Sequence, residues 1–466
     1  MKNKLIISAI LLGALALTGC DKKDDVLTLK VANWEEYIDL GDWGEDETIE
    51  LDNGKVILGE QSMVDDFEDW YFENYGERIK VDYSTFGTNE DLYNQITLGD
   101  VYDLVCPSEY MITKLAREEL LEKYDESFYD REDELNYYSR GVSPYISSVF
   151  SNLKLKDASL DRYAAGYMWG TLGIVYNPEL ITEEEAAHWS LLTDKHHYKQ
   201  ITVKDSVRDA YFAGLAMNRS AELLSPAFVN DPDYHEKLTE ALNCTDPEIV
   251  EEVQEILTRV KENVYSFETD AGKADMVTGK IAANQQWSGD AVFIMQQAAE
   301  EGLSLRYSAP EEGTNLWFDG WVMLKKGING DERKKKAAQA FVNFISMPEN
   351  AVRNMYYIGY TSVIAGGDDD TIYQYINYNY AGEDEAECVP HRIGYFFGDE
   401  ADEEDRYTVY AEEDSDEFYQ LDAQYPTKEV IDRSVVMACF EEEDNIRINR
   451  MWTNIRCFDL RRLFML

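Results

Sequence analysis

The stretch Val26-Leu-Thr-Leu-Lys-Val-Ala32 alternates apolar and polar residues and contains β-branched side chains, a pattern typical of a β-strand. Apolar residues at helical spacing follow from Met63 to Tyr71, and Gly76 is a typical end of a helix. Two more strands are predicted at 79–83 and 101–106, and a second helical pattern follows the latter. Strands that alternate with helices predict an α/β fold with a mainly parallel sheet.

The length of the chain predicts more than one hydrophobic core. It has 466 residues, whereas a single core rarely grows beyond about 250–300 residues. The patterns continue in the second half with a helix that begins at Asp246-Pro247, a strand over 280–287 and a helix that follows Asp331. We therefore expect two lobes. Residues 39–60 and 366–420 interrupt the pattern and are predicted as irregular insertions.

The N-terminus has the features of a secretory signal over residues 1–19. Two lysines precede the apolar run Leu5 to Leu17, which is too short for a stable transmembrane helix. The run ends in Leu17-Thr-Gly-Cys20, which matches the bacterial lipoprotein box. That match implies cleavage before Cys20, a lipid on its sulfur and a short linker over 20–26. An ordinary signal with an incidental cysteine is the alternative.

The charge of the chain limits its partners. The formal net charge is −49, from 92 acidic and 43 basic residues. Such a charge disfavours nucleic acid and anionic membrane surfaces, and it concentrates cations near the protein at low salt.

No residue pattern predicts a metal site. The cysteines other than Cys20 are widely spaced and odd in number, which predicts buried free thiols, although one bridge among the last three stays open. The adjacent His196 and His197 would face different directions on a regular element, and we predict a solvated pair. The acidic runs within 366–420 lack the glycine of an EF-hand loop, which favours a solvated surface. The remaining cysteines are Cys106, Cys244, Cys388, Cys439 and Cys457.

Clusters of aromatic and polar residues lie near the predicted strand ends, where open α/β sheets bind ligands. The segment Gly313-Thr-Asn-Leu-Trp-Phe-Asp-Gly320 shows the chemistry, because an indole face attracts an ammonium group and a carboxylate neutralises it. One such pair does not define a site, since most tryptophans simply bury area. The clusters are Asn33-Trp-Glu-Glu-Tyr37, Ser84-Thr-Phe-Gly-Thr-Asn89, Tyr102 to Tyr110, Tyr167-Met-Trp-Gly170, Trp287-Ser-Gly-Asp290, Leu316-Trp-Phe-Asp319 and Ile358-Gly-Tyr-Thr-Ser362.

In this order and spacing, the clusters resemble the spermidine/putrescine-binding proteins of polyamine ABC transporters, which are extracellular solute-binding proteins. The resemblance covers about residues 28–364 and resumes from Tyr425-Pro to Trp452. It implies a two-lobed periplasmic-binding-protein fold in which each lobe is a mainly parallel sheet flanked by helices and the ligand lies in the interlobe cleft. The predicted segments are 27–155 with 315–365 for lobe 1, and 156–314 with 366–466 for lobe 2, the latter containing the acidic, tyrosine-rich insertion 366–420.

The resemblance also implies a set of ligand-binding residues. Aromatic side chains would line the alkyl chain of a polyamine, and acids would meet its ammonium groups. The aromatic positions are Trp34, Tyr37, Tyr110, Trp287, Trp317 and Tyr360, the acidic positions are Glu36, Asp209 and Asp319, and Ser108 is a hydroxyl contact.

The chain departs from the family pattern at three positions. Ser206 stands where the family usually has the first of two acids, so one ammonium group would be less well compensated. Glu35 replaces a hydroxyl residue, and Met437 replaces a late glutamine. The choice between putrescine and spermidine therefore stays open.

We predict a lipid-anchored extracytoplasmic protein that captures putrescine or spermidine by lobe closure and delivers it to an ABC permease. It would be a monomer without catalytic residues, cofactor or metal, and no nucleophile-elbow, phosphate-loop or zinc-protease motif is present. One alternative is a receptor for another solute, such as a carboxylate ligand that would need Arg208. The other is a surface adhesion protein whose working part is 366–420.

Overall fold

The computed structural model describes residues 26–44, 47–153, 155, 158–269, 271–383, 387–399 and 406–457. The predicted signal 1–19, the predicted lipidation site Cys20 and all but the last residue of the predicted linker lie outside these ranges. No helix in the described ranges is long and apolar enough to cross a membrane.

Strand β1 (Leu27–Trp34) organises the N-terminal part of the fold. It pairs in parallel with β4 (Ile79–Phe86) along its whole length, and with β5 (Leu104–Val105) on its other edge. Helix α1 (Met63–Tyr75) lies between β1 and β4 in the sequence. It begins at Ser62, whose hydroxyl accepts a hydrogen bond from a backbone N–H, and it ends at Gly76 with φ 67°. These elements confirm the predicted strand–helix–strand pattern.

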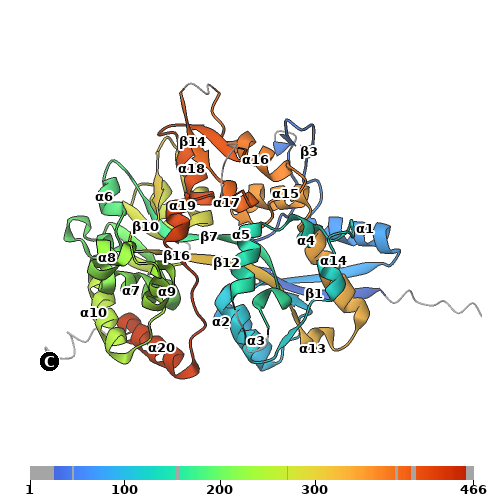
Figure 1. Cartoon of the computed structure of the whole chain (residues 1–466), viewed down its shortest axis with the longest axis horizontal. Coiled ribbons are helices and arrows are strands. Elements are labelled where there is room, and N and C mark those ends of the chain that lie inside the picture. The colour runs from blue at the N-terminus through green and yellow to red at the C-terminus, as the bar shows by residue number, and fades with distance from the viewer. Residues whose placement is uncertain are drawn as a thin grey trace, which may run out of the picture.

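A second parallel group of strands forms the other end of the molecule. Strand β8 (Ile201–Lys204) pairs in parallel with β9 (Ser266–Glu268) and with β10 (Ala283–Trp287). Helix α10 (Pro247–Asn263) begins at the predicted Asp246-Pro247 cap. Figure 1 shows α10 beside α7 (Val207–Leu223), α9 (Tyr234–Leu242) and α20 (Glu442–Cys457) at the end of the molecule away from β1.

Two long strands join the two groups. Strands β7 (Ala164–Tyr176) and β12 (Thr314–Leu324) are buried at every position and pair antiparallel, with a register shift between Asp319 and Gly320. The sheet therefore continues through the molecule in the order β4-β1-β5-β12-β7-β10-β8-β9. Parallel strands lie towards both ends, and antiparallel crossovers lie in the middle (Figure 1). The predicted two-lobed α/β fold is confirmed.

The apolar side chains divide with the lobes. One large core contains residues of β1, β4 and the first half of β7, and a second contains residues of β8, α7 and α10. A smaller third cluster lies around α12 (Ser288–Glu300). The five described cysteines, named above, are all free thiols, and only Cys106 is buried.

The segment 366–420 is not an irregular insertion. It contains α16 (Thr371–Tyr380), β14 (Cys388–Arg392), α17 (Gly394–Phe397), β15 (Thr408–Glu412) and the start of α18 (Asp416–Gln424). That prediction was wrong because the acidic runs interrupt the apolar pattern, while Ile372, Tyr395 and Phe396 are buried between them. Most of its buried residues join the lobe 1 core, whereas α18 packs against α12 and β11 (Arg306–Ser308) of the other lobe. The lobe boundaries themselves stay a prediction.

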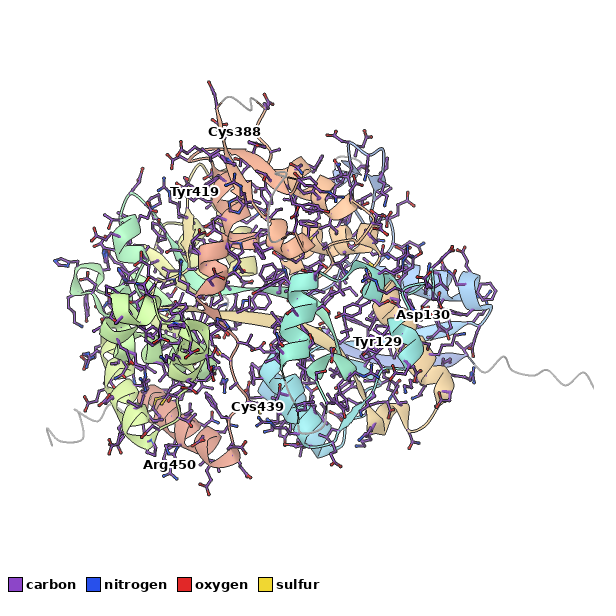
Figure 2. All side chains as sticks on the ribbon, in the orientation of Figure 1. Tyr129, Asp130, Cys388, Tyr419, Cys439 and Arg450 are labelled. Atoms are coloured by element: carbon purple, nitrogen blue, oxygen red, sulfur yellow. The ribbon has the colours of Figure 1, made fainter. Side chains whose placement is uncertain are left out.

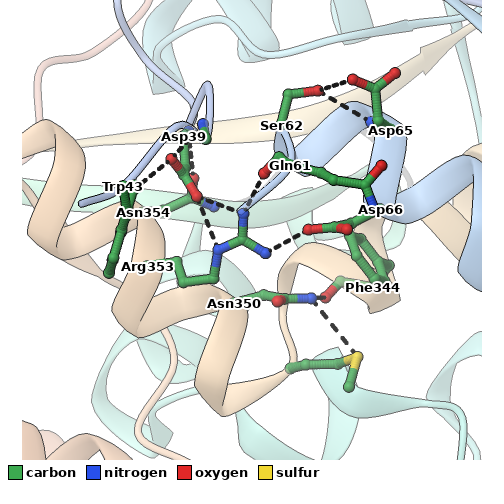
Figure 3. A network of polar contacts seen from close by, with 12 residues as sticks. Asp39, Trp43, Gln61, Ser62, Asp65, Asp66, Phe344, Asn350, Arg353 and Asn354 are labelled. Carbon is green, nitrogen blue, oxygen red and sulfur yellow. Dashed lines mark hydrogen bonds and ion pairs between the residues drawn. The ribbon is translucent and has the colours of Figure 1, made fainter. Parts of the chain in front are cut away.

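The segment 39–60 is fixed by a buried ion-pair network (Figure 3). The carboxylate of Asp39 is fully buried and lies 2.6 Å from Nη2 of Arg353, on helix α15 (Pro348–Ile358). Arg353 also pairs with Asp66 at 2.7 Å and donates to the Gln61 carbonyl at 2.8 Å. Within the described part of this segment, β2 (Ile49–Glu50) and β3 (Val56–Ile57) form a short hairpin.

The remaining described elements complete both lobes. They are α2 (Asn89–Leu98), α3 (Glu109–Arg117), β6 (Leu121–Glu122), α4 (Tyr137–Gly141), α5 (Pro144–Asn152), α6 (Glu183–Ala186), α8 (Pro226–Val229), α11 (Ala271–Val277), α13 (Lys325–Ile328), α14 (Glu332–Ile345), β13 (Thr361–Ser362), α19 (Lys428–Asp432) and β16 (Ser434–Val435).

Candidate functional site

Asp319 is the acidic centre of the site on the lobe 1 side. It lies on β12 at the register shift, and 6% of its surface is exposed. Its two carboxylate oxygens accept hydrogen bonds from the Ser108 hydroxyl at 2.7 Å and from the Tyr37 hydroxyl at 2.9 Å. Burial raises the pKa of Asp319 to about 6, although both hydrogen bonds oppose that rise. Within the described ranges no Lys, Arg or His pairs with it, so this buried carboxylate has no countercharge.

Aromatic rings surround this carboxylate. The ring of Tyr37 stands edge-on to the ring of Tyr360, with 5.2 Å between the centroids. The ring of Trp317 lies 5.5 Å from the ring of Tyr360. Trp317 is held by a hydrogen bond from its indole N–H to the Thr171 carbonyl at 3.1 Å. Trp34, at the end of β1, packs against Phe86 at 4.9 Å. Rings oriented in this way offer faces and edges to an alkyl chain.

The lobe 2 side of the site is built around Trp287, which ends β10 and packs against both main cores. Asp290, one turn into α12, accepts a hydrogen bond from the Tyr360 hydroxyl at 2.9 Å, which links the lobes. Asp290 also pairs with Lys204 at 3.2 Å and with Lys273 at 2.9 Å. These two cations hold the pKa of Asp290 below its usual value in spite of its burial.

Asp209 is a second buried acid on the lobe 2 side. It lies in the first turn of α7, is 5% exposed, and its backbone N–H donates to the Ser206 hydroxyl at 3.3 Å. Burial raises the pKa of Asp209, and hydrogen bonds with Ser206 and Trp287 oppose the rise. Ser206 therefore caps the helix that carries Asp209.

Tyr110 and Arg208 meet at the edge of the site. The Arg208 guanidinium lies 4.9 Å from the Tyr110 ring centre and 3.9 Å from that of Phe440, and it donates to the Ala438 carbonyl at 2.6 Å. The same segment reaches α3, because Arg117 donates to the Cys439 carbonyl at 3.0 Å. Figure 2 shows Cys439 in this connection, which descends between the lobes toward α20.

The structure thus brings most of the predicted residues together, but not all. Glu36 is exposed in the turn after β1, with φ 53°, and its charge acts on Tyr357 rather than on the carboxylate centre. Two of the clusters that were predicted at strand ends lie within strands instead. Tyr167–Gly170 and Leu316–Asp319 lie inside β7 and β12, because these strands continue through both lobes.

Several residues of the site were missed. Asp290 falls within a quoted cluster, but its contact with Lys204 joins residues 86 positions apart and has no local signal. Glu109 is 2% exposed, accepts a hydrogen bond from the Phe318 N–H, and burial raises its pKa to about 8. Asn89 donates to both Ser108 and Tyr110 at 3.0 Å, and its place in a quoted cluster was the available signal.

The two adjacent histidines differ from the predicted solvated pair. The side chain of His196 is 88% exposed and that of His197 only 8%. The Nε2 atom of His197 lies 3.2 Å from Glu185, and with Asp194 these three residues offer metal-ligand atoms within 4.8 Å of one another. Each acid already uses one oxygen to cap a short helix. The Glu185 carboxylate accepts a hydrogen bond from the Thr182 N–H, and the Asp194 carboxylate accepts one from the His196 N–H.

Comparison with known proteins agrees with this geometry. The profile of the bacterial extracellular solute-binding protein family matches residues 62–375. The spermidine/putrescine-binding periplasmic protein of Escherichia coli (strain K12) is 26% identical over 351 residues, covering 75% of this chain and 81% of its own. Its namesake from Salmonella typhimurium is 27% identical over 284 residues, covering 60% and 70%.

A solved structure shows the same fold. The spermidine/putrescine ABC transporter substrate-binding protein from Streptococcus pneumoniae superposes with a TM-score of 0.57 at 24% identity, covering 92% of this chain and 98% of its own. The predicted resemblance is confirmed, and the family is one of solute-binding proteins rather than of enzymes. Because the family profile spans more than half of the residues, the chain belongs to the bacterial extracellular solute-binding proteins.

Proposed function

We propose that this chain is a receptor for a small polyamine, which it encloses between its lobes and delivers to an ABC permease. The observation that carries the proposal is the Asp319 carboxylate, which is buried, enclosed by Tyr37, Trp317 and Tyr360, and without a protein cation in the described ranges. A buried carboxylate without a partner is costly, and an ammonium group of a ligand would remove that cost.

The second acid supports an extended ligand with charge at both ends. Asp209 belongs to the other lobe, is equally buried, and takes part in no ion pair within the described ranges. The rings between two such acids suit methylene groups. The names of the relatives agree, since the Escherichia coli relative is called a spermidine/putrescine-binding protein.

Lobe closure would be the working motion of this receptor. A ligand that contacts Asp319 on lobe 1 and both Asp209 and Trp287 on lobe 2 binds the closed form better than the open one, and so shifts the equilibrium toward closure. The hydrogen bond from the Tyr360 hydroxyl to Asp290, which joins the two lobes, would form in the same motion.

The remaining partners follow from the same proposal. The receptor would be a monomer outside the cytoplasm, anchored by lipid on Cys20 and presented to the permease. The Escherichia coli relative is called periplasmic, which agrees with a place outside the cytoplasm.

The two alternatives receive less support. A carboxylate ligand would need Arg208, but this side chain is already bonded to Ala438 and enclosed by two rings. An adhesion role for 366–420 would need a separable segment, yet this segment supplies Ile372 and Phe396 to the main core. Its deletion would therefore test folding rather than adhesion.

We expect polyamine affinity to decrease as the pH is lowered below about 6. The ligand amines stay charged over this range, whereas Asp319, with a pKa of about 6, must lose its proton to pair with them. From pH 7.5 to pH 5 the association constant should fall about tenfold, and binding near pH 6 should release protons. Calorimetric titration with putrescine, cadaverine, spermidine and spermine, in two buffers of different ionisation enthalpy, measures both effects.

The titration also tests the proposal itself. Saturable one-to-one binding at physiological salt supports a receptor, because salt screens nonspecific attraction to an acidic surface. Weak binding of all four amines that disappears with salt would reject it. Binding that is tight but equal at pH 7.5 and pH 5 would reject the role of Asp319 alone.

A further inference from the structure

Lys204 places a cation of the protein inside the proposed site. It ends strand β8, and its side chain is 1% exposed. Its ammonium group lies 4.4 Å from the ring centre of Trp287, 3.2 Å from an Asp290 oxygen and 2.6 Å from the Thr269 carbonyl. An indole face, a carboxylate and a carbonyl are the partners that bind an alkylammonium ion. The protein's own lysine therefore occupies a position with the chemistry of a ligand amine.

Asp290 is fully engaged by groups of the protein. One oxygen meets Lys204, and the other meets Lys273 at 2.9 Å and the Tyr360 hydroxyl at 2.9 Å. The Lys204 ammonium group therefore already occupies the indole face of Trp287 and one oxygen of Asp290. A further ammonium group placed there would find these partners taken, and the Lys204 charge, in a side chain only 1% exposed, would repel it.

The number of acids without a direct ion pair points the same way. Asp319 and Asp209 are buried and lack direct ion pairs within the described ranges, whereas Asp290 pairs with two lysines. Burial raises the pKa of Asp209, although the charges of Lys204 and Arg208 oppose that rise. Position 206, an acid in the family pattern, is a serine that caps α7. Two acids remain to compensate two ligand charges.

We propose that Lys204 is a specificity-determining residue that restricts the ligand to a linear diamine, by standing over Trp287 where a third ammonium group would otherwise lie. This inference rests on the proposed polyamine receptor and adds the charge of its ligand. It makes Lys204 the residue that decides between putrescine and spermidine, a choice that the sequence left open.

The test compares Lys204→Met with the unaltered protein in calorimetric titrations with putrescine and spermidine at physiological salt. Methionine retains an unbranched apolar stem and removes the charge. The unaltered protein should bind putrescine at least tenfold more tightly than spermidine. In Lys204→Met, the ratio of putrescine affinity to spermidine affinity should fall at least tenfold, because the position over the Trp287 face becomes available to the third ammonium group.

Lys273→Met is the matched control. It removes one positive charge from the same carboxylate, but its side chain is 25% exposed and its cation lies against the other oxygen. We expect less than a threefold change in the putrescine-to-spermidine ratio. An equal shift in both variants would mean that only overall charge matters, and would overturn the role assigned to the Trp287 face.

A ligand-side measurement keeps the inference testable if Lys204→Met does not fold. N1-acetylspermidine is longer than putrescine but carries two charges, so the unaltered protein should bind it more tightly than spermidine. Spermidine bound as tightly as its acetylated form, or an unchanged ratio in a folded Lys204→Met variant, would overturn the inference and leave the receptor standing. Absence of binding for every amine would instead reject the receptor itself.

Discussion

Replacing Asp319 by asparagine should weaken polyamine binding by two to three orders of magnitude, about 3–4 kcal/mol. Asp319→Asn removes a buried carboxylate that lies against the rings of Tyr37 and Trp317 and has no protein countercharge among the described residues. Asparagine retains the shape and can still bond to the hydroxyls of Ser108 and Tyr37. The loss should therefore appear in binding rather than in folding, and calorimetric titration with putrescine measures it.

The same variant should be more stable than the unaltered protein in the absence of ligand. The pKa of Asp319 is about 6 in the folded state, above the unfolded value of about 3.9, so its contribution to stability is present at low pH and is lost as pH rises through 6. Removing the charge should raise the free energy of unfolding at pH 7.5 by about 1–2 kcal/mol. It should also abolish the pH dependence of affinity.

Asp82→Asn is the control for overall charge. Asp82 is exposed on β4, opposite Lys30 of β1, and its replacement makes the same change in net charge. We expect its putrescine affinity to stay within twofold of the unaltered protein. A normal affinity in Asp319→Asn would show that the carboxylate centre is not the site.

Replacing Arg353 by methionine should lower the free energy of unfolding by about 3–5 kcal/mol. Asp39 would then remain fully buried without the guanidinium that now lies 2.6 Å away, and Asp66 would lose its partner on α15 (Figure 3). The network joins Asp39, at the start of the segment 39–60, and Gln61, directly after its end, to Arg353 on α15. Urea unfolding followed by circular dichroism measures the change.

Two further variants separate burial from simple pairing. Lys55→Met breaks ion pairs with Glu349 and Asp369, which join the same part of the chain to α15 and to the segment after it, but these side chains are 32–38% exposed. It should cost less than about 1 kcal/mol. Adding Asp39→Asn to Arg353→Met should restore at least half of the lost stability, since it removes the stranded charge. Equal effects of Arg353→Met and Lys55→Met would contradict the role assigned to burial.

The sequence predicts well those elements whose signal is local. The alternation of β1, the helical spacing of α1 from Met63 and its end at Gly76 are set by neighbouring residues, and all three agree with the structure. The same holds for the Asp246-Pro247 start of α10. Local signals failed for β7, because a strand buried at every one of its 13 positions shows no alternation.

The site was predicted less completely than the fold. Aromatic and acidic positions such as Trp317 and Asp319 could be carried over from the resemblance, one residue at a time. The role of the Lys204 cation could not be carried over in this way, because it depends on contacts with Asp290 and Trp287. Those contacts arise from the pairing of β8 with β10. Glu36 is exposed in a left-handed turn after β1, and its role in binding stays a prediction.

The segment 366–425 gives the two lobes a connection besides the crossover strands, because α16 and α17 pack in one lobe while α18 packs against the other. A receptor whose halves move freely loses conformational entropy each time it closes on a ligand. This additional connection narrows the range of open arrangements, so that less entropy remains to be lost. More of the contact energy in the closed state can then appear as affinity, and a small ligand with few contacts can be held long enough to reach the membrane.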